Sequence, residues 1–267
     1  MSTHNLFRED LGSRRYDLDW VRIGAFSLLI LYHVGMYYVT WDWHVKSPDA
    51  SHAIEPLMML TSPWRLSLLF LVSGVATGFL LARQGAGHFL GQRSFRLLIP
   101  LAFGMLVIVP PQSYLEVVEK LRYAGSFADF YRLYITGFHG FCRGSDCLIM
   151  PTWNHLWFVA YLWVYTLVLY LFVRAAPPII PWLRRLAERR LSGVGIVLWP
   201  LAYLVAIRLS LAPKFPATHI LVGDWYNHAM YFGVFLLGFS LAGARTAWAT
   251  LERARWLTLG LAVLGWA

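Results

Sequence analysis

An arginine and a histidine share one apolar stretch near the start of the chain, and both side chains could do chemistry. Ten mostly apolar residues separate Arg22 from His33. On an α-helix, eleven positions at about 100° each amount to three turns plus roughly 20°, so the two side chains share a face, roughly 16 Å apart along the axis. If this helix crosses a membrane, Arg22 lies near one surface and His33 near the middle of the bilayer.

Ionisable groups inside a membrane are costly, and they usually face a protein interior or a water-filled cavity. A neutral imidazole can take a proton from a hydroxyl group, so His33 is a candidate general base. The alternative is a histidine that joins helices by hydrogen bonds for structural reasons alone. Arg22 could act with His33 on the shared face, or it could be a snorkelling anchor at the membrane surface.

Two further arginines, Arg93 and Arg96, lie three positions apart before the third apolar run. Their guanidinium groups would lie on one helical face, which suits a phosphate-bearing ligand. The alternative is a basic cluster that only sets the membrane topology.

Ser73 and Gly74 are small residues in the second apolar run, where a ligand or another helix could approach closely. Gly74 and Gly78 form a small-xxx-small pattern, so a helix-packing seam is the alternative to a substrate site. The sequence around Ser73 lacks the Gly-x-Ser-x-Gly pattern of a nucleophilic serine. Arg65 could orient an acidic group or snorkel at the outer end of the same helix. His155 could bind substrate or be an ordinary interface residue.

Other polar residues receive no catalytic assignment. His44 and Asp49 have the spacing of an acyltransferase H-x-x-x-x-D pattern, but they lie in a polar loop without its usual context, and we interpret the match as chance. Asp224, His228 and Tyr231 flank a later apolar run and are left unassigned.

The composition predicts that a membrane positions these residues. The 267 residues are 58% hydrophobic and 14% charged, against about 25% charged in soluble domains. The 13 tryptophans and 14 tyrosines fit membrane interfaces. The net charge of +9 would suggest nucleic acid in a soluble protein. Here the basic residues cluster in particular segments, so we expect a lipid bilayer and no nucleic-acid partner.

We therefore expect an all-α, polytopic transmembrane bundle of about seven helices, at 19–40, 56–82, 97–112, 154–173, 193–211, 226–243 and from 256 onward. Residues 1–18, 83–96, 174–192 and 244–255 form basic connecting segments, which predicts a cytoplasmic N-terminus. The last run holds twelve residues, whereas a span needs about 20. We expect one membrane domain over 1–267, incomplete at its C-terminus.

Cys142 and Cys147 then fall on the outer side of the membrane, in a segment of mixed charge. Outside a bacterial cytoplasm they could form a disulfide, and two free cysteines are the alternative. They are too few, without histidine support, for a zinc site. We expect no metal.

The order of these motifs resembles the acyltransferase type 3 family of membrane O-acyltransferases, and within it the branch of glucan biosynthesis protein C. The matching segments are Leu18-Asp19-Trp20-Val21-Arg22 with the R-x10-H spacing to His33, Phe70-Leu71-Val72-Ser73-Gly74, Arg93 and Arg96 with Pro100, His155-Leu156-Trp157-Phe158, and the glycine-bearing helix from Tyr231. One departure is Val75-Ala76, where aromatic residues are common in the family.

The resemblance implies transfer of an acetyl or succinyl group from cytoplasmic acyl-CoA to a hydroxyl of an extracytoplasmic glycan or similar acceptor, in a bacterial inner membrane. Acyl-CoA would be a co-substrate, with no permanently bound cofactor. His33 would be the base, Arg22 would hold the thioester or a donor phosphate, and Arg93 and Arg96 would bind the phosphates of coenzyme A.

We take Ser73, Arg65 and His155 as candidate substrate-binding residues. A membrane transporter or permease is the alternative function, because an intramembrane arginine and histidine could equally form a proton relay or a substrate path. A non-catalytic membrane partner is the third possibility.

Overall fold

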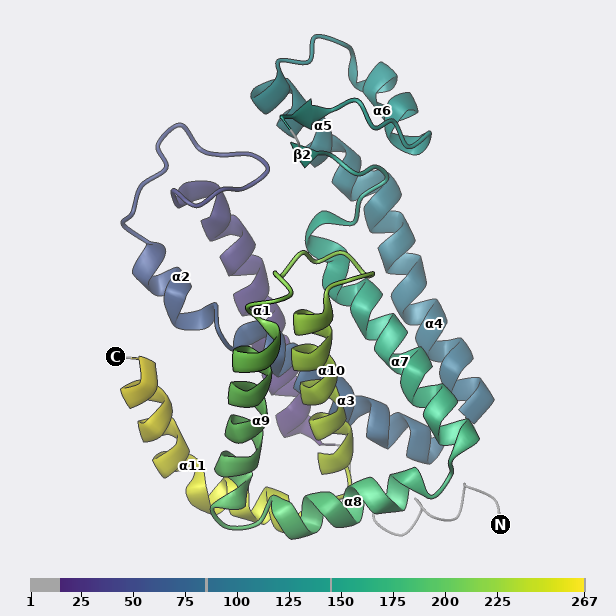
Figure 1. Ribbon diagram of the computed structural model, residues 1–267, viewed down its shortest axis with the longest axis vertical. Coiled ribbons are helices and arrows are strands. Elements are labelled where there is room, and N and C mark those ends of the chain that lie inside the picture. Colours follow the sequence, from purple (N-terminus) through teal and green to yellow (C-terminus); the bar gives the residue numbers. More distant parts are fainter. Residues whose placement is uncertain (1–14, 85, 145, 267) are drawn as a thin grey trace.

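The computed structural model describes residues 15–84, 86–144 and 146–266. The regular secondary structure of this part of the chain is helical except for two short antiparallel strands, β1 (Cys142–Arg143) and β2 (Asp146–Cys147). The α-helices are α1 (Tyr16–Tyr38), α2 (Glu55–Thr61), α3 (Arg65–Arg83), α4 (Ala86–Phe103), α5 (Val109–Leu121), α6 (Phe127–Ile135), α7 (Trp157–Ala175), α8 (Ile179–Arg190), α9 (Gly195–Leu211), α10 (Trp225–Leu241) and α11 (Arg245–Trp266) (Figure 1). A π-helix, η1 (Gly104–Ile108), joins α4 to α5, and a 3₁₀ turn, η2 (Asn154–Leu156), precedes α7.

Several of these helices are long and apolar enough to cross a membrane. Four segments qualify by length and composition: Tyr16–Tyr38, Glu55–Arg83, Ala86–Leu121 and Asn154–Ala175. The number rises to six if the bent pairs α8 with α9 and α10 with α11 each form one span. The predicted all-α, multi-pass architecture is therefore confirmed. Each of the seven expected segments contains a helix, but seven spans are not confirmed.

Several segments that were expected to be loops are helical instead. α4 begins at Ala86, so Arg93 and Arg96 lie inside a helix rather than in a basic loop. α8 occupies most of 174–192, and α11 begins at Arg245. Few apolar residues are enough for such a helix when they recur at helical spacing. In α4, Phe89 is fully buried, and Leu90 and Leu97 pack against the same core.

The segment 113–152 was also expected to be a connection, yet it forms a small subdomain. α5, α6 and the β1–β2 hairpin enclose a core of their own around Val117, Phe130 and Tyr134. A disulfide joins Cys142 to Cys147 across the hairpin. Of the two alternatives for these cysteines, the bridge is confirmed.

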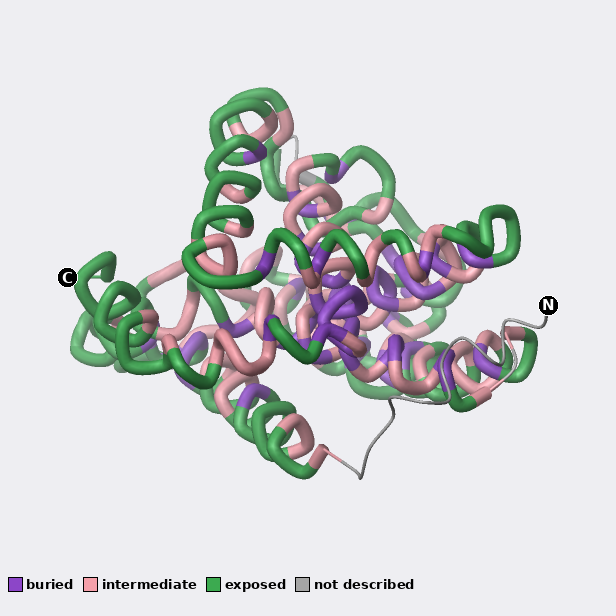
Figure 2. Tube along the Cα trace, turned by 90° about the horizontal axis from the view of Figure 1, so that it is seen from below, coloured by how far each residue is buried: buried purple, intermediate pink, exposed green. Residues whose placement is uncertain are grey.

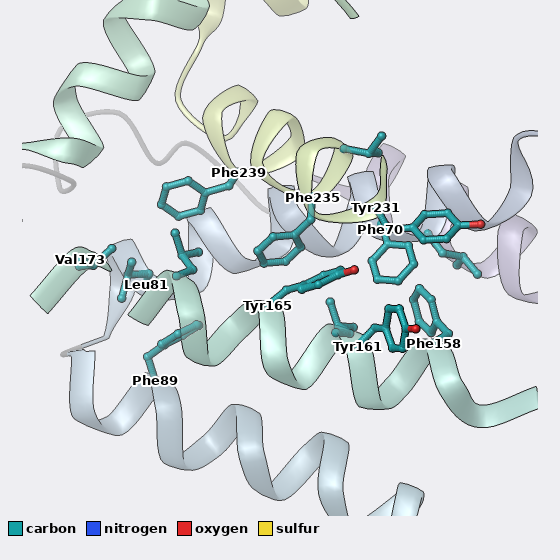
Figure 3. Packing of buried hydrophobic residues seen from close by; sticks show 14 of the residues in the cluster. Phe70, Leu81, Phe89, Phe158, Tyr161, Tyr165, Val173, Tyr231, Phe235 and Phe239 are labelled. Carbon is teal, nitrogen blue, oxygen red and sulfur yellow. The ribbon is translucent and has the colours of Figure 1, made fainter. Parts of the chain in front are cut away.

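The main core lies where α3, α7 and α10 meet (Figure 3). Phe70 of α3 is fully buried, with ring centroids 4.5 Å from Phe158 and 4.7 Å from Tyr231. A Cβ on Gly74 would collide with the backbone oxygen of Phe235, so only glycine lets α3 and α10 approach this closely. The packing-seam interpretation of Gly74 is confirmed.

The molecule has two chemically different ends (Figure 1). The start of α1, the start of α11 and the helix α8, which carries Arg184, Arg185, Arg189 and Arg190, lie at one end, here called the basic end. The hairpin, α5, α6 and the loop 39–54 lie at the other, here called the hairpin end. Buried residues gather at the centre of the bundle (Figure 2). The helices α9 and α11 are largely exposed. Their exposed side chains include Leu198, Leu209, Leu257 and Leu264, as suits a surface in contact with lipid.

Candidate functional site

A cavity of about 430 Å³ opens at the hairpin end, and three of the predicted site residues line it. We call it the histidine cavity. Its walls come from α1, the loop 39–54, the start of α3, the segment before α7 and the loop before α10. The lining residues are Leu29, Tyr32, His33, Met36, Trp43, His44, Arg65, Leu66, Thr152, Trp153, Asn154, His155, Trp157, Phe158, Thr218, His219 and Ile220.

His33 is held in one tautomer by the backbone of its own helix. Its Nδ1 lies 2.7 Å from the carbonyl oxygen of Leu29. A carbonyl oxygen only accepts, so Nδ1 carries the proton and donates it. The neutral ring then has its lone pair on Nε2. Nε2 can therefore accept a proton, as a general base must.

His155 and Arg65 join His33 in this cavity, as the sequence alone could not have shown. The rings of His33 and His155 lie 5.3 Å apart between centroids. His155 comes from η2, the turn that starts α7, and its buried Nδ1 has no hydrogen-bond partner among the described residues. The three residues therefore present an imidazole lone pair, a second imidazole and a cation to one space.

Arg65 is an unusual neighbour for a histidine base because it is buried without a counter-ion. The residue is only 7% exposed, and its Nε and Nη1 find no hydrogen-bond partner in the part of the chain that the structure describes. Its guanidinium lies over the ring of Tyr32. A buried cation without a partner is unfavourable, so this side chain suits an anionic or carbonyl group of a ligand.

His44 also lines the cavity, although the sequence predicted no functional role for it. Its Nδ1 lies 2.6 Å from Oε2 of Glu116, which belongs to α5. Asp49, the other half of the chance pattern, does not line the cavity. The partner lies 72 positions away in sequence, so no local pattern could have revealed it.

The loop before α10 closes one wall, and a buried carboxylate holds it in place. Asp224 is fully buried and accepts hydrogen bonds from the hydroxyl of Tyr161 at 2.5 Å and from the backbone N–H of His219 at 3.0 Å. Burial lowers the pKa of His219, while Asp224 opposes that shift. His228 bonds the Tyr165 hydroxyl and a backbone carbonyl through its two ring nitrogens, so its role is structural.

A second cavity, of about 440 Å³, lies between α1 and α3 toward the basic end. We call it the arginine cavity. Three arginines line it, Arg15, Arg22 and Arg83, together with Leu18, Asp19, Val72, Ala76, Phe79 and Leu80. Arg22 pairs with Asp19 at 3.3 Å, and its side chain is half exposed. Such a cavity can hold an anion.

Arg93 and Arg96 do not line the arginine cavity, but the charge of Arg93 interacts with that of Arg22, which does line it. Arg93 is repelled by the charges of both Arg96 and Arg22. Its Nε and Nη2 are buried and have no hydrogen-bond partner within the described ranges. The structure thus brings the cation Arg22 of α1 near the cation Arg93 of α4. No carboxylate of the described residues neutralises Arg93.

Arg22 and His33 both face α3, as their spacing predicts, but they line different cavities. His33 lies nearer to the Tyr38 end of α1 than to the middle of the helix. The buried Ala25 and Leu69 lie on the helix segments between the two cavities. Ser73 is half-buried on α3 in the same region and lines neither of them.

Comparison of the sequence with known proteins shows the family of this chain. The chain is 24% identical over 241 residues to glucans biosynthesis protein C of Salmonella typhi and of Salmonella typhimurium, which covers 86% of this chain and 58% of each relative. The protein of the same name from Salmonella paratyphi A is 25% identical over 243 residues, with the same coverage. The chain therefore spans 58% of the length of these relatives. No solved structure matches it. The family model described as an acyltransferase domain matches residues 15–267, and the chain belongs to the acyltransferase type 3 family.

Proposed function

We propose that this protein is a membrane O-acyltransferase that moves an acyl group from acyl-CoA at the basic end to a hydroxyl of a glycan at the hairpin end. One observation carries this proposal: His33, whose Nε2 is free to accept a proton, and Arg65, which has no counter-ion, line the same cavity. The name of the relatives, glucans biosynthesis protein C, supports a glucan as the acceptor.

The reaction needs one base and one group that stabilises the developing negative charge. The acceptor oxygen attacks the thioester carbonyl while its proton passes to His33 Nε2. The carbon–sulfur bond then breaks, and the departing thiolate takes the proton back from the imidazolium. The N–H groups of Arg65 would stabilise the oxyanion or bind a carboxylate of the acyl group.

The donor would enter from the basic end. Arg22, Arg93 and Arg96 would bind the phosphates of coenzyme A, because guanidinium groups match phosphate oxygens in charge and geometry. The acyl-bearing arm would extend between α1 and α3, past the half-buried Ser73, toward His33. Arg22 and His33 are roughly 16 Å apart along the helix axis, a length that an extended arm can span.

The proposed entry of the donor from the basic end also determines how the protein is oriented in the membrane. The basic end, with α8, would face the cytoplasm of a bacterium across its inner membrane. The disulfide of the hairpin end would then lie in an oxidising space. Both acetyl and succinyl groups suit the proposal, and the buried cation Arg65 gives a succinyl carboxylate a partner.

Acyl transfer in membranes containing the full-length protein tests the proposal. Labelled acetyl-CoA and succinyl-CoA would be supplied together with a soluble glucan oligosaccharide. We expect wild type to label the oligosaccharide and His33→Ala to lose roughly 10²- to 10⁴-fold in rate, the usual contribution of a general base. His52→Ala is the matched control, because His52 is exposed and lies outside the cavity.

A wild-type rate for His33→Ala would contradict the proposed role of this residue. Absence of label with every variant would contradict the transferase activity itself. In that case uptake assays with the same proteins would test the transporter alternative.

A further inference from the structure

His44 and Glu116 form a second histidine pair at the histidine cavity. The loop after α1 supplies His44 to the cavity lining, and α5 supplies Glu116 behind it. Both side chains are largely buried, at 23% and 17% exposure. Because a carboxylate oxygen accepts hydrogen bonds, the neutral ring carries its proton on Nδ1 and its lone pair on Nε2. No described residue forms a hydrogen bond with that Nε2.

The carboxylate behind His44 is itself held in place. Oε1 of Glu116 accepts a hydrogen bond from Nζ of Lys120 at 3.2 Å, and Lys120 also reaches Asp42 at 3.3 Å. Each oxygen of Glu116 therefore has a partner, which limits rotation of the carboxylate. The ring of His44 is consequently fixed in its orientation as well as in its tautomer.

A second pair in the chain shows that such a contact need not face a site. Nδ1 of His52 lies 3.0 Å from Oε2 of Glu55, in the same arrangement. However, the His52 side chain is 80% exposed, and the residue lines neither the histidine cavity nor the arginine cavity. The distinguishing feature of His44 is its place on the cavity wall.

Trp43 contacts two of the cavity's histidines, His33 and His44, in each of which Nδ1 is hydrogen-bonded. Its ring centroid lies 5.7 Å from that of His33 and 4.9 Å from that of His44. These two histidines thus present two hydrogen-bond acceptors beside one flat apolar surface. A sugar ring offers the complementary features, an apolar face and several hydroxyl groups, whereas a simple alcohol could use only one of the two acceptors.

We propose that His44 is an acceptor-binding residue: its Nε2 accepts a hydrogen bond from one hydroxyl of a polyhydroxylated acceptor while a second hydroxyl reacts at His33. Glu116 is the positioning residue that orients His44. This inference rests on the proposed acyltransferase function and adds to it a group that selects the acceptor.

The test separates acceptor binding from donor binding in the full-length protein. Initial rates are measured with labelled acyl-CoA while a glucan oligosaccharide is varied. We expect His44→Ala to raise the KM for the oligosaccharide about tenfold, the effect of one lost hydrogen bond, and to leave the KM for acyl-CoA unchanged. His44→Gln, which retains an accepting oxygen, should recover part of the loss. Glu116→Gln should raise the same KM by a smaller factor.

Matched controls and a second acceptor make the test decisive. His52→Ala and Glu55→Gln alter the pair that lies outside both cavities and should leave both KM values unchanged. With a simple alcohol as acceptor, His44→Ala should equal wild type. If His44→Ala does not accumulate as folded protein, His44→Gln and Glu116→Gln decide the matter by the same KM.

An unchanged KM for the oligosaccharide in all three variants would overturn the inference, as would equal increases for donor and acceptor. Absence of transfer by wild type would instead defeat the proposed function, so the two failures are distinguishable.

Discussion

The guanidinium of Arg65 stacks on the ring of Tyr32, with its Cζ 3.2 Å from the ring centroid. The contact joins the start of α3 to α1 directly beside His33. Stacking on an aromatic face stabilises a cation by about 0.5–2 kcal/mol without neutralising it. Tyr32 therefore holds Arg65 at the cavity, while the N–H groups on Nε and Nη1 have no hydrogen-bond partner among the described residues.

Replacing Arg65 by lysine should impair transfer although the positive charge is kept. An ammonium group lacks the planar fork that stacks on Tyr32 and binds two oxygens. We expect kcat/KM to fall roughly tenfold to a hundredfold, the effect of losing a charge-assisted hydrogen bond. The fall should be larger with succinyl-CoA than with acetyl-CoA. Arg208→Lys is the control, because Arg208 lies over Tyr226 at an exposed position. Full activity of Arg65→Lys would contradict the proposed role.

Neutralising Arg93 should weaken donor binding alone. Its buried N–H groups are unpaired, and its charge lies close to those of Arg22 and Arg96. We expect Arg93→Gln to raise the KM for acyl-CoA about tenfold and to leave the KM for the acceptor unchanged. Arg174→Gln is a suitable control, because Arg174 is an exposed arginine at the end of α7. Equal KM values in wild type and Arg93→Gln would exclude a role in donor binding.

Adding a methyl group at Gly74 should destabilise the bundle. The new Cβ would collide with the backbone of Phe235, which cannot move without shifting α10. We expect Gly74→Ala to lower the thermal midpoint of the detergent-solubilised protein by several degrees, a cost of about 1–3 kcal/mol for overpacking. Gly91→Ala makes the same chemical change in α4, where a Cβ meets nothing within 4 Å. Its midpoint should stay equal or rise, because alanine favours a helix. Equal losses in the two variants would argue against the close contact of α3 with α10.

The wall residue His219 should make stability depend on pH. Burial lowers its pKa in the folded protein below the ordinary value of 6.5. Below that value the unfolded chain takes up a proton that the folded chain resists, so stability falls as the pH decreases from about 6.5 toward the lower folded pKa. His219→Gln should flatten this acid-side loss. Thermal midpoints between about pH 8 and pH 5 would measure it, and parallel curves for the two proteins would contradict the prediction.

Much of the architecture could be predicted from local sequence. Seven apolar runs marked where helices would lie, and the shared face of Arg22 and His33 followed from their spacing alone. The sequence did not predict the basic starts of α4 and α11, nor any part of α8. Their apolar residues are few, so composition masked a helical pattern that only burial against neighbouring helices makes favourable.

What the sequence determined by itself is therefore local: helical periodicity, the tautomer-fixing turn around His33, and the small residues of α3 that permit close packing. The tertiary structure alone decided that Arg22 and His33 belong to separate cavities, that Arg65 and His155 join His33, and that Glu116 lies behind His44. Helix periodicity arises from contacts a few residues apart, whereas a cavity arises where distant segments meet. The pairing of His44 with Glu116 depends on how α5 packs beside the loop after α1, which no short stretch of sequence encodes.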